Sequence, residues 1–232
     1  MDLIWDGVRE AVRLIFTGNG YVFEVTFTSL TVSGLATLIA LVIGFGIAAF
    51  LVFSAPPGRT LTLSVFNAGM ALPPAAVGLL VAVLLWRAGP LGRLHLLYTP
   101  GAIVLAQAVI ATPVITALSV AGLQSLHPRL RLQVLALGAS RWQAAVLLFR
   151  EARLSLLAAV MAGFGAAISE VGATIMVGGN IKGSTRTLTS AMVLEVQQGD
   201  FETAIALSFI LLALIFAVVL VLTIIQQRRP AR

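Results

Sequence analysis

Residues 25 to 58 read Val25-Thr-Phe-Thr-Ser-Leu-Thr-Val-Ser-Gly-Leu-Ala-Thr-Leu-Ile-Ala-Leu-Val-Ile-Gly-Phe-Gly-Ile-Ala-Ala-Phe-Leu-Val-Phe-Ser-Ala-Pro-Pro-Gly58, without a single Asp, Glu, Lys or Arg. A helix needs roughly 20 mostly apolar residues to cross the hydrocarbon core of a bilayer, and this stretch is longer than that. We therefore predict a membrane-spanning helix within it.

Four more stretches free of charged residues follow, at 60–86, 94–128, 154–169 and 203–227. The third of these four reaches the length of a span only if Glu170 and the apolar residues up to Val177 are included. Hydrophobic residues make up 59% of the chain, charged residues only 10%, and the mean hydropathy is +1.03, which excludes an ordinary soluble domain. The sequence predicts an all-α polytopic membrane protein with five transmembrane helices.

The first 20 residues predict a separate element, an amphipathic N-terminal helix. Over residues 3–16, Ile4, Val8 and Val12 fall on one side of a helix, and Arg9 and Arg13 fall largely on the other. This pattern suits a helix lying in the membrane interface, although a short helix packed on the spans is an equal alternative. Acidic residues stand where a signal peptide has basic ones, so no cleaved signal is expected. Residues 21–232 then form the five-span domain.

An odd number of spans places the two ends of the chain on opposite sides of the membrane, and the distribution of basic residues predicts which side is which. If the loop at 124–153 is cytoplasmic, nine basic residues share its side and six lie on the other. The nine are Arg59, Arg129, Arg131, Arg141, Arg150, Arg153, Arg228, Arg229 and Arg232; the six are Arg9, Arg13, Arg87, Arg93, Lys182 and Arg186. We predict an inner-membrane protein with its N-terminus outside and its C-terminus in the cytoplasm.

Several chemistries are disfavoured by what the chain lacks. Its only lysine, Lys182, follows Ile181, so no Gly-Lys-Ser/Thr phosphate-binding loop exists and any ATP must be hydrolysed by another protein. There is no Cys, and His95 and His127 are far apart, so neither thiol chemistry nor a metal site is expected. Basic residues are scattered rather than gathered on one face, which argues against nucleic-acid binding. We expect a transport subunit rather than an enzyme.

Prolines interrupt two of the predicted spans, at Pro73-Pro74 and at Pro113. Each proline removes a backbone donor and bends its helix. A kink of this kind is either purely structural or a place where broken backbone lines a route through the protein. We predict that Pro73, Pro74 and the stretch from Ser169 to Thr174 line such a route.

Glu170 is the only acidic residue inside a predicted span, near its outer end. Charged groups in the membrane are usually functional, so Glu170 could be the coupling acid of a cation-driven carrier. The alternative is a carboxylate held by an arginine or by backbone donors at a helix end.

Residues 174–189 combine hydroxyl and amide side chains, several glycines and two cations, Lys182 and Arg186. Backbone N–H groups at glycines, together with hydroxyls, can accompany an oxyanion without trapping it. A receptor surface and an ordinary polar loop remain open alternatives. The two cations could also be occupied by salt bridges to Glu170, Glu195 or Asp200.

The run Arg131-Leu-Gln-Val-Leu-Ala-Leu-Gly-Ala-Ser-Arg-Trp142 resembles the EAA loop of binding-protein-dependent ABC importer permeases. It departs from the family pattern at Leu132-Gln133-Val134, which replaces Glu-Ala-Ala, whereas the core Gly138-Ala139-Ser140 is intact. The resemblance implies a type I importer permease fold in which this loop contacts an ATPase. We expect a short helix over 133–146, with the contact made by Gln133, Leu135, Ala136, Leu137, Gly138, Ala139, Ser140 and Arg141.

Two other stretches resemble the molybdate and tungstate permeases of that class. They are Asn67-Ala-Gly-Met-Ala-Leu-Pro-Pro-Ala-Ala-Val-Gly78 and the region from Glu170 to Thr189, whose Met176-Val-Gly-Gly-Asn-Ile-Lys-Gly183 is most similar to the tungstate branch. The resemblance implies a homodimer, two cytoplasmic ATPase subunits that bind ATP and Mg²⁺, and an extracytoplasmic tungstate-binding protein. In that arrangement Ser169, Glu170 and Thr174 join the prolines on the route, while Asn180, Lys182 and Arg186 lie on the external face.

Overall fold

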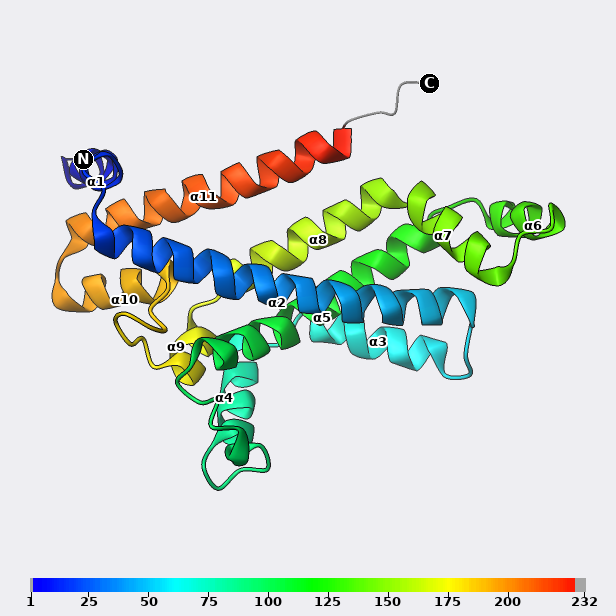
Figure 1. Ribbon diagram of the computed structural model, residues 1–232, viewed down its shortest axis with the longest axis horizontal. Helices are drawn as coiled ribbons and strands as arrows, with labels where there is room; N and C mark the ends of the chain where they lie inside the picture. Colours follow the sequence, from blue (N-terminus) through cyan, green and yellow to red (C-terminus); the bar gives the residue numbers. More distant parts are fainter. Residues whose placement is uncertain (1, 228–232) are drawn as a thin grey trace.

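The computed structural model describes residues 2–227, apart from the side chains of Asp2, Leu3 and Pro128, and these residues form helices and loops without a strand (Figure 1). The all-α prediction is confirmed. The elements are α1 (Asp2–Phe16), α2 (Gly20–Phe53), α3 (Arg59–Gly69), α4 (Pro74–Leu85), η1 (Gly92–Leu94), α5 (Pro100–Gln124), α6 (Pro128–Ala136), α7 (Arg141–Glu151), α8 (Arg153–Ile168), α9 (Gly172–Gly178), α10 (Leu188–Gln198) and α11 (Phe201–Gln227).

Three of these helices, α2, α5 and α11, are long and apolar enough to cross a membrane, and the number of spans rises to five if each of two bent pairs counts as one. The bent pairs are α3 with α4 and α8 with α9. Helix α2 alone has 34 residues, which at 1.5 Å per residue is about 50 Å and exceeds the hydrocarbon thickness. The predicted spans therefore exist, but two of them are broken.

The break between α3 and α4 is much sharper than the sequence predicts. The two helices meet at 101°, so residues 60–86 do not form one kinked helix as expected. Pro73 adopts an extended conformation and Pro74 is the first residue of α4. A proline fits the first turn of a helix, where no backbone N–H donor is needed, and it cannot continue the helix before it. By contrast, Pro113 lies inside α5, which runs unbroken from Pro100 to Gln124.

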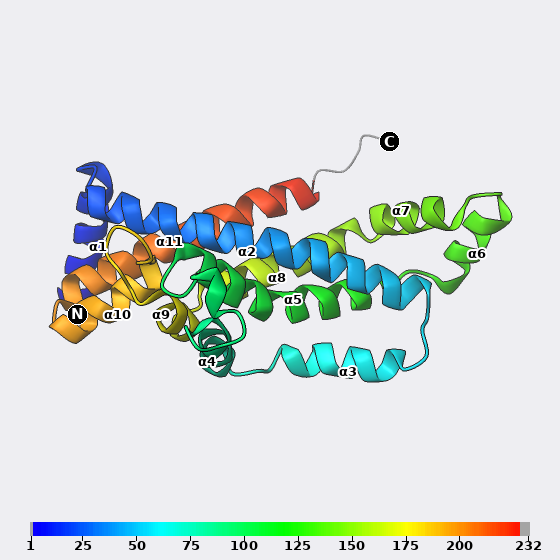
Figure 2. The same ribbon diagram turned by 60° about the horizontal axis from the view of Figure 1, so that its bottom comes forward.

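The long helices lie side by side along one axis, α3 runs alongside them, and α4 projects sideways from the axis (Figures 1 and 2). Helices α1 and α10 lie at one end with α9 close by, and α6 lies at the other end, beyond the turn that joins α2 to α3, with α7 leading back towards the bundle. Helix α11 runs from the first end towards the second. The segment with Lys182 and Arg186 therefore lies opposite the loop at 124–153, as predicted, while Arg228, Arg229 and Arg232 are outside the described residues.

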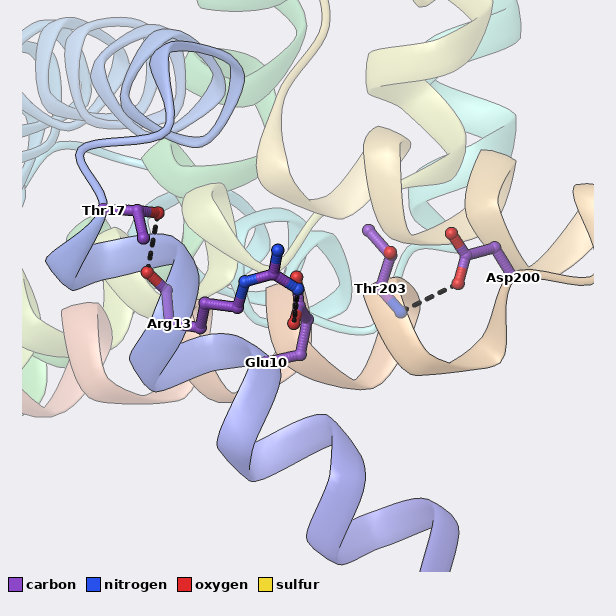
Figure 3. A network of polar contacts seen from close by, with 5 residues as sticks. All are labelled: Glu10, Arg13, Thr17, Asp200 and Thr203. Atoms are coloured by element: carbon purple, nitrogen blue, oxygen red, sulfur yellow. Dashed lines mark hydrogen bonds and ion pairs between the residues drawn. The ribbon is translucent and has the colours of Figure 1, made fainter.

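Helix α1 packs on α11, which is the second of the two interpretations of the N-terminal segment. It lies across the end of the bundle and packs on the start of α11, where Gly7 faces Ile205 closely and Ala11 is buried. Its polar side carries the pair of Arg13 and Glu10, shown with the cap of α11, in which the Thr203 N–H donates to Asp200 (Figure 3). A third side leaves Ile4, Trp5, Val12, Ile15 and Phe16 exposed. The helix is thus packed on α11 and leaves one apolar face uncovered in the single subunit, and its placement in a membrane interface stays a prediction.

Small residues hold the long helices together. Helix α2 buries Ala36, Ala40 and Ala48, and α5 buries a matching series that includes Ala106 and Ala111. In lipid there is little hydrophobic force between helices, so close approach of backbones at small residues supplies the packing energy. The broken helices use the same device, because a Cβ added to Gly78 of α4 would collide with the backbone of Ala173 in α9.

Replacing Gly78 with Ala should therefore destabilise the protein, whereas Gly34→Ala should not. Both glycines lie in helices, so both substitutions gain the same helix propensity, about 1 kcal/mol. Only the added methyl at Gly78 meets backbone, and nothing lies within 4 Å of the Cβ position at Gly34. Overpacking typically costs about 1–3 kcal/mol. Thermal unfolding in detergent should show a lower midpoint for Gly78→Ala than for Gly34→Ala, and equal midpoints would contradict the close α4–α9 contact.

Candidate functional site: the coupling loop and the broken helices

The loop at 124–153, called the coupling loop after the family resemblance, contains two short helices rather than the single helix predicted over 133–146, and that prediction is wrong. Helix α6 ends at Ala136 and α7 begins at Arg141. Between them Gly138 has a φ of +88°, a left-handed conformation that glycine adopts without strain. Ser140 then caps α7 through a reciprocal pair of bonds with Gln143. The Gly138-Ala139-Ser140 core therefore separates the end of α6 from the beginning of α7.

The turn between α6 and α7 and the helix ends beside it present exposed apolar side chains. Leu137 is 88% exposed and Trp142 is 77% exposed, with Leu132 nearby in sequence and also exposed. Exposed apolar groups at a loop tip are typical of a protein interaction site. All eight predicted coupling residues are exposed or half-buried. The sequence analysis did not single out Leu132 and Trp142, although large apolar residues on a short polar helix are a signal.

Contacts that the sequence did not predict tie this loop to α2. The Arg131 guanidinium donates to the carbonyl oxygen of Phe53 at 2.8 Å and lies over its ring at 5.6 Å. From α7, the ring of Phe149 packs against those of Phe53 and Phe45 at 6.2 and 5.7 Å. A cavity of about 510 Å³ remains between Phe53, Ser54, Arg131, Leu135, Arg141 and Ala144. A force applied to the loop would therefore be passed to the end of α2.

At the break between α8 and α9, Glu170 is 8% exposed and its carboxylate accepts the Ala173 N–H at 2.7 Å. Its own carbonyl oxygen accepts the Thr189 hydroxyl at 3.1 Å. No ion pair to Glu170 occurs among residues 2–227. This geometry matches the second interpretation from the sequence analysis, in which the Glu170 carboxylate is held by a backbone donor at the start of a helix.

The two predicted route segments lie next to each other in the fold. A Cβ on Gly172, just after the α8–α9 break, would touch Ala75 of α4 at 3.4 Å. Around this contact Pro73, Pro74 and Ser169 are exposed on the subunit. Thr174 is different, because it is 1% exposed and accepts a long bond of 3.4 Å from Gln107. The exposed members remain candidates for the route, and Thr174 is an interior residue.

At the opposite end, the segment with Asn180, Lys182 and Arg186 folds against Tyr21 at the start of α2. The guanidinium of Arg186 donates to the side chain and to the backbone carbonyl of Asn180, at 3.2 and 3.3 Å. Both cations lie over the Tyr21 ring, Lys182 at 5.7 Å and Arg186 at 5.9 Å. The expected alternative, salt bridges to Glu170, Glu195 or Asp200, does not occur in the described part of the chain. Lys182 is exposed and Arg186 half-buried.

The segment is also fixed by acidic groups that do not pair with its cations. Glu24 accepts the Gly183 N–H at 2.7 Å, and Glu195 accepts the Tyr21 hydroxyl at 3.2 Å. Glu24 was not expected here from sequence, because it is distant in the chain, whereas Glu195 was expected only as an ion-pair partner of the cations. Elsewhere in residues 2–227, no three His, Asp or Glu side chains gather as metal ligands.

Comparison with known proteins gives consistent matches. Residues 40–229 match the family model described as "Binding-protein-dependent transport system inner membrane component". A probable anion ABC transporter permease protein of Haloferax volcanii is 40% identical, over 91% of this chain and 94% of its own. A tungstate uptake system permease protein of Peptoclostridium acidaminophilum is 36% identical, over 98% of this chain and 100% of its own. The solved structure of an amino acid ABC transporter with histidines has the same fold, with a TM-score of 0.67 at 18% identity over 93% and 97% of the two chains.

The exposure of the broken helices can be tested with single cysteines, because the natural chain has none. Ser169→Cys should react with a membrane-impermeant maleimide, since Ser169 is exposed at the proposed route. Thr174→Cys replaces a hydroxyl residue five positions away that is buried, and it should react only after denaturation. Equal labelling of the two native variants, or no labelling of Ser169→Cys in any nucleotide state, would contradict the assignment of Ser169 to an aqueous route.

Proposed function

The chain belongs to the family of binding-protein-dependent transport system inner membrane components, and from this we propose that it is the membrane subunit of an ATP-driven tungstate importer. The observation that carries the proposal is the end-to-end similarity to a tungstate uptake permease, 36% identity over 98% of this chain. Subunits of this kind are not themselves enzymes. In our proposal two cytoplasmic ATPase subunits bind ATP and Mg²⁺, and an extracytoplasmic tungstate-binding protein delivers the anion.

The proposed working unit is a homodimer. One copy has at most five spans, too few to enclose a pore comfortably, whereas two copies supply ten. The surface of α3 supports this arrangement, because none of its residues is buried in the single subunit. Its exposed side carries polar Thr62, Ser64 and Asn67 beside apolar Leu61 and Val65. A helix with such a surface fits a protein interface or a wet route better than lipid.

Transport would proceed by alternating access. ATP binding draws the two ATPase subunits together, and each carries with it the turn at Gly138. The bonds from Arg131 to Phe53, and the packing of Phe149 on Phe45, would pass this movement to α2. Packed cores respond to such a displacement by switching between discrete arrangements rather than by continuous deformation. The paired α4 and α9, in contact at Gly78, would move as one unit beside the route.

Selectivity between tungstate and molybdate would reside in the binding protein. The two ions are isostructural dianions of nearly equal size, and a route lined by uncharged donors has little basis for separating them. Around the α8–α9 break, the one carboxylate, Glu170, is already occupied by a backbone N–H.

The decisive experiment is reconstitution of this subunit with its ATPase and binding protein in proteoliposomes. Tungstate should accumulate only when the binding protein is present outside and ATP is present with the ATPase. Accumulation driven by a proton or sodium gradient without ATP would instead support a cation-coupled secondary carrier and would overturn the proposal.

In the same system, Gly138→Trp should abolish uptake and stimulated ATP hydrolysis while leaving the protein inserted. The substitution strains a left-handed turn and places a bulky ring at the ATPase contact. Gly199→Trp is a matched control, since Gly199 has a similar φ of +82° and equally open surroundings but lies at the opposite end. Wild-type coupled turnover by Gly138→Trp, or equal losses in both variants, would remove the coupling assignment.

Lys182 should accelerate entry of the dianion by long-range attraction. We expect Lys182→Gln, alone and with Arg186→Gln, to slow uptake by about twofold to tenfold at low ionic strength and less at physiological salt, where screening occurs within about 8 Å. Arg186→Gln also removes bonds to Asn180, so the single Lys182 variant is the cleaner test. Arg93→Gln, another exposed cation on the predicted external side, serves as control. Unchanged rates across salt concentrations would leave Lys182 as an ordinary loop residue.

A further inference from the structure

A long apolar groove opens beside the coupling loop, between α2, α7, α8 and α11. Its volume is about 970 Å³, at the upper end of the range of small-molecule pockets. Its walls are almost entirely hydrocarbon and aromatic, with Leu41, Phe45 and Ala49 from α2, and Leu157 and Val160 from α8. From Leu41 to Ala49 the wall of α2 is about 12 Å long at 1.5 Å per residue. The groove therefore extends from the coupling-loop end well into the depth of the bundle.

Cations stand at one end of the groove only. Arg150 lies in the last turn of α7 and Arg153 begins α8, and both line the groove and are exposed. In residues 2–227 the ion pairs are Arg9 with Asp6 and Arg13 with Glu10, so neither groove arginine pairs with a carboxylate, not even with Glu151 between them. Trp142 also lines this end and is 77% exposed. Arginines at one end of an apolar surface are typical of the boundary between lipid and water.

We propose that this groove is a binding site for one anionic phospholipid of the cytoplasmic leaflet. An acyl chain lies along Phe45, Gly46 and Leu157, and the phosphate of the headgroup lies between Arg150 and Arg153. The charge pattern matches this ligand because a phospholipid is apolar along its tail and negative at one end. Basic pockets between membrane helices on the cytoplasmic side are suited to such headgroups.

A helix from a second copy of the chain fits the groove less well. An apolar helix would fill the walls, but it would also cover Arg150 and Arg153 without a partner for their charge, and burying an unpaired charge is strongly unfavourable. A lipid headgroup leaves both guanidinium groups at the water boundary and neutralises them. The site also adjoins Phe149, which connects the coupling loop to α2. A bound lipid would thus pack against the segment through which the loop is joined to the bundle.

The walls can be tested at Gly46, whose Cβ position has no atom within 4 Å although it lies in the groove. Gly46→Leu should fill the space that the acyl chain occupies without disturbing the fold. Gly34→Leu is the matched control, a glycine of the same helix with equally open surroundings outside the groove. The readout is binding of phosphatidylglycerol to the full-length protein in its purified assembly, followed by native mass spectrometry and compared with phosphatidylcholine of identical chains.

The headgroup site is tested by Arg150→Gln with Arg153→Gln, with Arg129→Gln as an exposed cation of the same loop outside the groove. Wild type should prefer phosphatidylglycerol over phosphatidylcholine by about tenfold or more, the scale expected for two basic side chains at an anionic headgroup. The double arginine variant should lose this preference, and Gly46→Leu should lose retention of both lipids, while both controls behave as wild type.

Three results would overturn the proposal. Unchanged lipid retention in Gly46→Leu would show that no acyl chain occupies the groove. An unchanged preference for phosphatidylglycerol in the double arginine variant would show that the headgroup lies elsewhere. Loss of subunit association in Gly46→Leu, with lipid retention intact, would assign the groove to a second copy of the chain. None of these readouts depends on which ion is transported, so they remain separate from the test of tungstate uptake.

Discussion

Backbone N–H and C=O groups that lose their helical hydrogen bonds inside a membrane must find other partners or reach water. The two helix breaks of this structure are built around that requirement. Two of the five potential spans are broken, and each break is covered differently. At the α8–α9 break, the Glu170 carboxylate takes up the free Ala173 N–H, and the Thr189 hydroxyl bonds the Glu170 carbonyl oxygen. At the α3–α4 break, Pro74 has no N–H to satisfy, and α4 packs on α9 through Gly78. Each broken helix stabilises the other, which explains how irregular backbone persists beside a proposed route.

The small residues that pack the helices together also limit how the core can deform. Alanines and glycines bring α2, α5, α8 and α9 into close contact, and such a core resists gradual deformation. The coupling loop is joined to it through a few large contacts, Arg131 with Phe53 and Phe149 with two phenylalanines of α2. Through these contacts, a displacement of the loop would reach α2. The apolar groove next to Phe149 lies at that connection.

At the end of the bundle that carries Lys182, specific contacts hold the charged side chains in place. Arg186 is held by Asn180 and, with Lys182, lies over Tyr21, while Glu24 and Glu195 bond to a backbone N–H and to the Tyr21 hydroxyl. The cations thus keep their charge available instead of neutralising it in ion pairs. Cations over an aromatic ring remain attractive to an approaching anion, and the exposed Lys182 is the better placed of the two.

The sequence by itself determined the helical class, the positions of the apolar spans and the opposition of the coupling loop to the Lys182 segment, because hydropathy and charge act locally along the chain. It also identified Gly138-Ala139-Ser140 and the helix-breaking prolines, since glycine and proline restrict the backbone wherever they occur. Only the tertiary structure decided that the Pro73-Pro74 break is 101° rather than a kink, that Gly172 meets Ala75, that Thr174 is buried, and that Arg131 holds Phe53. These features depend on contacts between residues far apart in the chain, and no local pattern specifies which distant surfaces will meet.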